Sequence, residues 1–73
     1  MSTEEILKII KTGDIYYFTN LYHYNVRYEK GFVYIGSTLP DGYPSDLEII
    51  KEEDFDKWRN GEPVKIYELS EVK

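Results

Sequence analysis

Alternation of apolar and polar side chains along residues 22–29 is the feature of this sequence that most constrains its fold. Even positions carry aromatic or aliphatic side chains and odd positions carry polar ones, in the order Tyr22, His23, Tyr24, Asn25, Val26, Arg27, Tyr28 and Glu29. Successive side chains of a strand point to opposite faces of a sheet, so this period of two predicts a strand with one buried and one solvated face.

A two-residue hairpin turn is predicted at Lys30–Gly31, directly after this strand. The returning strand then places Val33 opposite Tyr28 on the buried face. It also places Tyr34 opposite Arg27 on the other face, where a guanidinium over an exposed ring contributes about 0.5–1 kcal/mol.

An earlier hairpin, turning at Asn20–Leu21, would add a third strand to the same sheet. In that register Ile15 and Tyr17 join Tyr24 and Val26 on the core face, and the three strands form a meander. The register leaves four rings on the opposite face of the sheet, namely Tyr16, Phe18, Phe32 and Tyr34.

The N-terminal residues predict an amphipathic helix. Ser2 and Glu5 have the spacing of a capping box, in which each side chain accepts from a backbone N–H of the first turn, and Gly13 supplies a stop. The apolar stripe that would lie on the sheet consists of Ile6, Ile9 and Ile10.

Two readings of residues 47–59 compete after the turn-rich segment 38–46, "TLPDGYPSD". A continuous helix would gain a capping box from Ser45 and Glu48. It would also place Lys51, together with Asp54, inside its apolar stripe.

A strand over residues 47–51 followed by a short helix over residues 52–59 avoids this conflict, and we favour it. The first turn of that helix is acidic, as the helix dipole prefers, and Phe55 and Trp58 share its inward face. The segment "PVKIYEL", residues 63–69, reads as a final strand.

The predicted fold class is therefore α+β, in a single domain over residues 1–73. An N-terminal helix precedes an antiparallel sheet of four to five strands, with the short helix before the last strand. This element order is also that of a small SH3-like barrel. Hydrophobic residues at 41% and charged residues at 32% are typical of a folded protein rather than a disordered one.

Catalytic and metal chemistry find no support in the residue types present. Cysteine is absent and His23 is the lone histidine, which leaves no thiolate nucleophile, zinc cluster or Ser/His/Asp spacing. The acids near a glycine at Asp41, Asp46 and Glu48 lack the spacing of an EF-hand. We expect a non-enzymatic protein with no cofactor, no metal site and no catalytic residue.

The N-terminal stretch "MSTEEILKIIKTG" carries acids where a signal peptide carries bases. No apolar run is long enough to span a bilayer. We expect a cytoplasmic protein of a bacterial or infected host cell, with no membrane partner.

Negative charge is concentrated in the second half of the chain. Residues 1–40 hold four acids and four bases, whereas residues 41–73 hold ten acids and five bases, which accounts for the whole net charge of −5. A dense row of carboxylates raises a negative potential that attracts basic surfaces. The predicted partner-binding residues are these carboxylates and two nearby rings: Asp46, Glu48, Glu52, Glu53, Asp54, Asp56, Tyr43 and Tyr34.

In size, cysteine-free composition and acidity, the whole chain resembles the small inhibitors that phages encode against host DNA-binding proteins. This resemblance implies DNA mimicry, in which carboxylates stand in for phosphates that a duplex presents once per about 1.7 Å of its axis. The implied partner is a basic DNA-binding protein, for example a histone-like nucleoid protein, a nuclease or a polymerase subunit. A homodimer would double the charged track and relieve a small core.

An alternative hypothesis uses the aromatic residues as a platform on the sheet for single-stranded nucleic acid or a peptide. Bases stack on rings displayed by such modules, for which Tyr16, Phe18, Tyr34 and Arg27 are the candidates here. Such platforms also need a basic groove for the backbone, whereas this chain is acidic overall. Direct binding of nucleic acid is therefore not expected.

Overall fold

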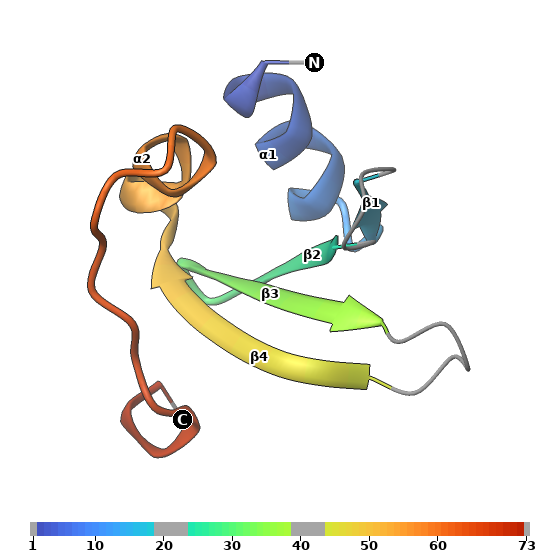
Figure 1. The fold of residues 1–73 in the computed structure, drawn as a ribbon. Helices are drawn as coiled ribbons and strands as arrows, with labels where there is room; N and C mark the ends of the chain where they lie inside the picture. The colour runs from blue at the N-terminus through green and yellow to red at the C-terminus, as the bar shows by residue number, and fades with distance from the viewer. Residues whose placement is uncertain (1, 19–23, 39–43, 73) are drawn as a thin grey trace.

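The computed structural model describes residues 2–18, 24–38 and 44–72 and shows an α+β fold, as predicted (Figure 1). In chain order the elements are helix α1 (Thr3–Lys11), strands β1 (Tyr16–Tyr17), β2 (Tyr24–Glu29), β3 (Phe32–Thr38) and β4 (Pro44–Lys51), the 3-10 turn η1 (Glu52–Asp54), helix α2 (Phe55–Arg59) and the 3-10 turn η2 (Leu69–Glu71). No helix within these ranges has the length and apolar character needed to cross a bilayer.

The four strands form one open antiparallel sheet in the order β1-β2-β3-β4. Both helices lie on the same side of this sheet, and the C-terminal segment descends past β4 to η2 (Figure 1). The core lies between the helices and the sheet. It consists of the buried residues Ile6, Ile10, Val26, Val33, Ile35, Ile50 and Phe55.

The predicted capping box at the start of α1 is confirmed. The Oγ of Ser2 accepts from the N–H of Glu5 at 3.2 Å, and the carboxylate of Glu5 accepts from the N–H of Ser2 at 3.3 Å. The bonds that the Glu5 carboxylate accepts from the N–H and from the hydroxyl of Ser2 lower the pKa of Glu5 below its ordinary value. The helix ends before Gly13, whose φ of +100° is a conformation that glycine adopts at little cost. Ile6 and Ile10 are buried as predicted, and Ile9 is half-buried.

The β2–β3 hairpin has the predicted turn and register. Lys30 and Gly31 both adopt positive φ, at 49° and 87°, as a two-residue turn of this kind requires. Val33 faces Tyr28. The guanidinium of Arg27 lies 4.4 Å from the ring centroid of its cross-strand neighbour, which confirms the predicted cation–π contact.

The predicted register of β1 was wrong by one residue. Tyr16, not Ile15, lies opposite Val26, and the N–H of Phe18 donates to the carbonyl of Tyr24 at 2.7 Å. A slip of one residue moves every side chain to the other face. Tyr17 is therefore 61% exposed and Ile15 47% exposed. Tyr16 and Phe18, two of the four rings predicted on the outer face, pack on the core instead. The proposed Asn20–Leu21 turn lies outside the described residues.

The strand-then-helix reading of residues 47–59 is confirmed, and the continuous helix is wrong. Strand β4 runs to Lys51 and is followed directly by η1 and α2. Phe55 is fully buried, and the rings of Phe55 and Trp58 stack at 5.9 Å between centroids. Both aromatic side chains face the core, because a spacing of three residues places them on one side of the helix.

The predicted fifth strand over residues 63–69 is reduced to a single bridge. The N–H of Tyr67 donates to the carbonyl of Ile49 at 2.8 Å, and the chain then enters η2. Glu68 starts that turn, because its N–H donates to the carboxylate of Glu71 at 2.8 Å. This local capping competes with strand pairing. The sheet consequently has four strands, the short helix follows the last of them, and no SH3-like barrel closes.

Candidate functional site

The predicted acidic surface is spread over β4, η1 and α2. Glu48 belongs to β4, Glu52, Glu53 and Asp54 form η1, and Asp56 lies in α2. Asp46 lies in β4, and only its backbone belongs to the described part of the structure. Tyr43 lies outside the described residues. Tyr34 is only 5% exposed, so the prediction of an exposed ring at this position was wrong.

Glu48 points to the side of the sheet on which the helices lie. It is paired across strands with the buried Ile35, and its Oε2 accepts from the indole Nε1 of Trp58 at 3.0 Å. The hydrogen bond satisfies the one polar atom of the Trp58 ring and fixes the orientation of the ring. Glu48 therefore connects the sheet to α2.

Glu52 joins the end of the sheet to α1. Its Oε2 lies 2.6 Å from the Nζ of Lys11, and its Oε1 accepts from the hydroxyl of Tyr28 at 3.3 Å. The bond from Lys11 lowers the pKa of the Glu52 carboxyl below its ordinary 4.5, and it raises the pKa of Lys11 above its ordinary 10.5. One of the predicted interface carboxylates is thus already neutralised within the fold.

The ion pair of Lys11 and Glu52 is expected to stabilise the fold only between these two titrations. A depressed carboxyl pKa stabilises above the ordinary value, and the effect is lost as pH falls through the lowered pKa of Glu52. A raised lysine pKa stabilises below the ordinary value, and the effect is lost as pH rises through the raised pKa of Lys11. Because both side chains are partly exposed, the coupling is small.

A double-mutant cycle with Lys11→Met and Glu52→Gln, followed by urea denaturation, measures this coupling. We expect favourable coupling near neutral pH and none once the solution is acid enough to protonate Glu52. Coupling of the same size in both conditions would show that packing of the two side chains, not their charge, carries the contact.

Asp56 ties α2 to α1. Its Oδ1 accepts from the hydroxyl of Thr3 at 2.6 Å, and its Oδ2 accepts from the amide of Asn60 at 3.4 Å. The same hydroxyl of Thr3 accepts from a guanidinium nitrogen of Arg59 at 3.0 Å. Asp56 is exposed and charged, yet its position is determined by contacts within the fold.

Glu53 and Asp54 remain the carboxylates with the weakest ties to the fold. Glu53 is exposed and Asp54 is half-buried. Across residues 2–18, 24–38 and 44–72, the ion pairs are those of Lys11 with Glu52 and of Arg27 with Glu29. Glu52 is accordingly the only carboxylate of η1 and α2 that a base neutralises directly in that part of the chain.

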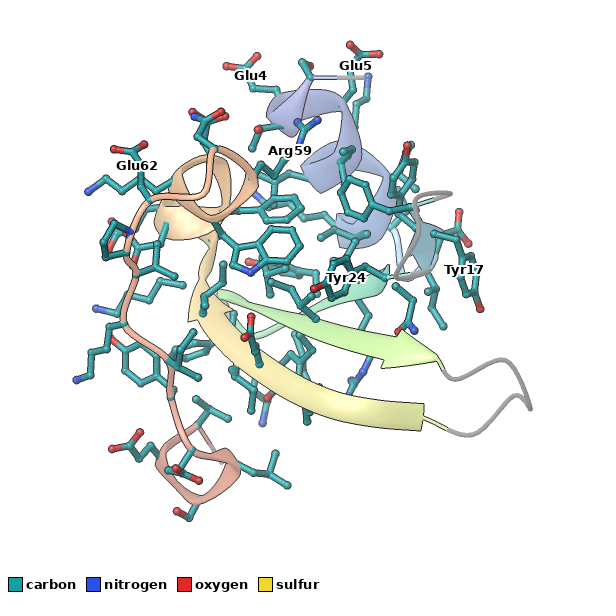
Figure 2. The ribbon with its side chains drawn as sticks, in the orientation of Figure 1. Glu4, Glu5, Tyr17, Tyr24, Arg59 and Glu62 are labelled. Atoms are coloured by element: carbon teal, nitrogen blue, oxygen red, sulfur yellow. The ribbon has the colours of Figure 1, made fainter. Side chains whose placement is uncertain are left out.

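An aromatic hollow lies between the sheet and α2. Its volume is about 430 Å³, and it is lined by Phe18, Tyr24, Trp58, Arg59 and Gly61. The rings of Tyr24 and Trp58 are nearly perpendicular, at 79° with centroids 5.5 Å apart, and the ring of Phe18 is inclined by 56° to that of Trp58 at 6.2 Å. Figure 2 shows Arg59 between α1 and α2, with Tyr24 below it on the sheet.

Sequence reasoning missed this hollow as a site. It placed Trp58 in the core and counted Tyr24 among the core residues, and it assigned no role to Arg59. The adjacency of Trp58 and Arg59 on a helix was a visible signal. No signal in the sequence indicated that Phe18 lines the hollow, because the predicted register of β1 put this ring on the other face of the sheet.

The four residues of the predicted aromatic platform do not share a surface. Tyr16 and Phe18 contact each other on the helix side of the sheet, with centroids 5.1 Å apart. Tyr34 and Arg27 lie opposite each other on the other face. A single strand of nucleic acid could not lie across all four at once.

No group of three acidic or histidine side chains within the described ranges comes together to hold a metal ion. Comparison of the chain with protein-family models, with curated proteins and with solved structures found no match. The candidate functions therefore depend on the carboxylates of η1 and α2 and on the aromatic hollow beside them.

Proposed function

We propose that this chain is a non-enzymatic binding protein whose second-half carboxylates dock on the basic surface of a DNA-binding protein and block its groove as a DNA mimic. The observation that supports the proposal is that few of these acids form an ion pair with a base of the described chain. Among the described residues, Lys11 is the only base in an ion pair with a carboxylate of η1 or α2. Glu53, Asp54 and Asp56 are thus in no ion pair in that part of the structure, and we propose that they meet the partner.

Hydrogen bonds within the fold support the proposal in a second way. Glu48 and Asp56 accept from uncharged donors, Trp58 and Thr3, which hold these carboxylates in place without cancelling their charge. A carboxylate on a fixed element loses less conformational entropy on binding than one on a mobile chain. Glu53 and Asp54, between these two anchored acids in the sequence, form the centre of the proposed surface.

The electrostatic potential of fixed negative charges also accelerates encounter with a basic groove. Salt screens this potential. Affinity for the partner is therefore expected to fall as ionic strength rises. A two-fold dimer of the chain, part of the same proposal, would present two such surfaces.

The test is displacement of a fluorescent DNA duplex from a basic protein, followed by anisotropy. A histone-like nucleoid protein, a nuclease and a polymerase subunit, each loaded with the duplex, serve as targets. We expect the wild-type chain to displace the duplex from at least one target. The double variant Glu53→Lys/Asp54→Lys should lose at least about tenfold in displacement, because it places repulsive charge where the partner is basic.

The matched control is Asp14→Lys/Glu29→Lys, which changes the net charge by the same amount at two exposed positions outside η1 and α2. It should displace the duplex nearly as well as the wild type. Equal losses in both variants would show that net charge alone drives association. Failure to displace DNA from all three targets, or binding of a labelled single-stranded oligonucleotide by the free chain, would contradict the mimic.

A further inference from the structure

The aromatic hollow beside α2 has the geometry of a cage for an organic cation. Three rings of different inclination, those of Phe18, Tyr24 and Trp58, form adjacent walls instead of a parallel stack. Its volume of about 430 Å³ is within the range of small-ligand pockets, roughly 300–1,000 Å³. Rings attract a cation through their negative faces, and several rings around one space strengthen the attraction.

One carboxylate lies at the edge of this hollow. Glu48 accepts from the Nε1 of Trp58 at 3.0 Å, so a carboxylate is attached to the edge of one wall. Glu62 directly follows Gly61 of the lining, but it is exposed and lies on the side of α2 away from Tyr24 (Figure 2). The charge of Glu48 therefore favours a cationic occupant beside Trp58.

Arg59 is the one base among the described residues of the lining, and its guanidinium already has partners within the fold. Its guanidinium donates to the hydroxyl of Thr3, which in turn donates to the carboxylate of Asp56. The guanidinium also lies 5.9 Å from the ring centroid of Phe18. The fold thus already holds one guanidinium against a wall of the hollow, which is the contact that an incoming cation would make with the other rings.

From this geometry we propose that the hollow is an aromatic cage for the cationic head of an arginine or lysine side chain of the partner protein. The inference rests on the proposed function, since a partner with a basic surface supplies such side chains. Carboxylates of η1 would attract the basic surface, and the cage would accept one side chain from it. Desolvated aromatic and arginine contacts of this kind often dominate the binding energy of an interface.

Trp58 is the only tryptophan of the chain, so its fluorescence reports directly on the cage. The probes are N-acetyl-arginine amide and tetramethylammonium chloride, with sodium chloride at equal ionic strength and sodium benzoate as comparisons. We expect a saturable fluorescence change with both cations and none with either sodium salt. A response to benzoate alone would overturn the proposal in favour of an anion site led by Arg59, and no saturable response to any probe would also overturn it.

Two variants test the walls of the cage. Tyr24→Leu should weaken binding of both cations severalfold because it removes one ring. Glu48→Gln should weaken it as well, since the amide oxygen can still accept from Trp58 while the charge is lost. Tyr17→Leu is the matched control and should bind as the wild type, because the Tyr17 ring points away from the hollow at the sheet edge (Figure 2).

Thermal unfolding of each variant separates loss of the cage from loss of the fold. A Glu48→Gln variant that is folded and binds both cations with unchanged affinity would contradict the proposed role of the carboxylate, and unchanged binding by Tyr24→Leu as well would overturn the cage.

The variant Glu53→Lys/Asp54→Lys should retain cation binding. Cation binding without duplex displacement would remove the proposed function alone, and displacement without cation binding would remove the cage alone.

Discussion

Replacing Phe55 with alanine is expected to lower the free energy of unfolding by about 3–5 kcal/mol. Phe55 is fully buried, belongs to the core cluster beneath the helices, and stacks on Trp58 with centroids 5.9 Å apart. Alanine would leave a cavity that the backbone of a short helix cannot fill. Since small domains have a total stability of about 5–15 kcal/mol, this loss is a large fraction of the whole.

Urea denaturation followed by circular dichroism measures this loss. Phe55→Leu keeps most of the apolar volume and should cost much less, so it remains measurable if the alanine variant is unfolded. Tyr17→Ala, which truncates a ring that is 61% exposed, should change stability little. Similar losses for Phe55→Ala and Tyr17→Ala would mean that the packing of α2 on the sheet is not as described.

Replacing Ile6 with alanine is the second large effect, with an expected loss of about 2–5 kcal/mol. Ile6 is fully buried on the face of α1 that packs on the sheet. Alanine has the higher intrinsic helix propensity, so a loss must come from packing rather than from the helix itself.

A graded series makes the prediction for α1 quantitative. Ile6→Val should cost about 0.5–1.5 kcal/mol, because it removes one methylene group instead of three carbons. Ile15→Ala, at a position 47% exposed, should cost clearly less than Ile6→Ala. Equal costs at positions 6 and 15 would contradict the docking of α1.

Local structure could be predicted well wherever neighbouring residues decide it. The capping box of Ser2 and Glu5 and the turn at Lys30–Gly31 depend on contacts within a few residues. The register of β2 on β3 follows from that turn, because a two-residue loop determines which residues face each other.

The register of β1 could not be predicted in the same way. Both faces of the β1 segment are apolar, since Ile15, Tyr16, Tyr17 and Phe18 follow one another without a polar residue. Alternation therefore does not choose a face. The choice depends on which rings fit against Trp58 from a distant part of the chain, and Phe18 contacts that ring.

The candidate site, too, could be predicted from the sequence only in part. Composition located the acids in the second half, yet it could not tell that Glu52 would be neutralised by Lys11 or that Asp56 would be bonded to Thr3. Both partners lie in α1, far away in the sequence. Of the described carboxylates in the predicted group, Glu52 is the one that the fold neutralises, and the role of the others as binding residues remains a prediction.

By itself, the sequence determined helix α1 with its capping box, the β2–β3 hairpin with its turn, and the sign of the charge on the second half, because these depend on short-range periodicity and on composition. The tertiary structure alone decided which face of β1 is buried, that residues 63–69 add one bridge instead of a strand, and that Phe18, Tyr24 and Trp58 surround a common hollow. The physical reason is that packing between distant segments selects among local alternatives of nearly equal free energy.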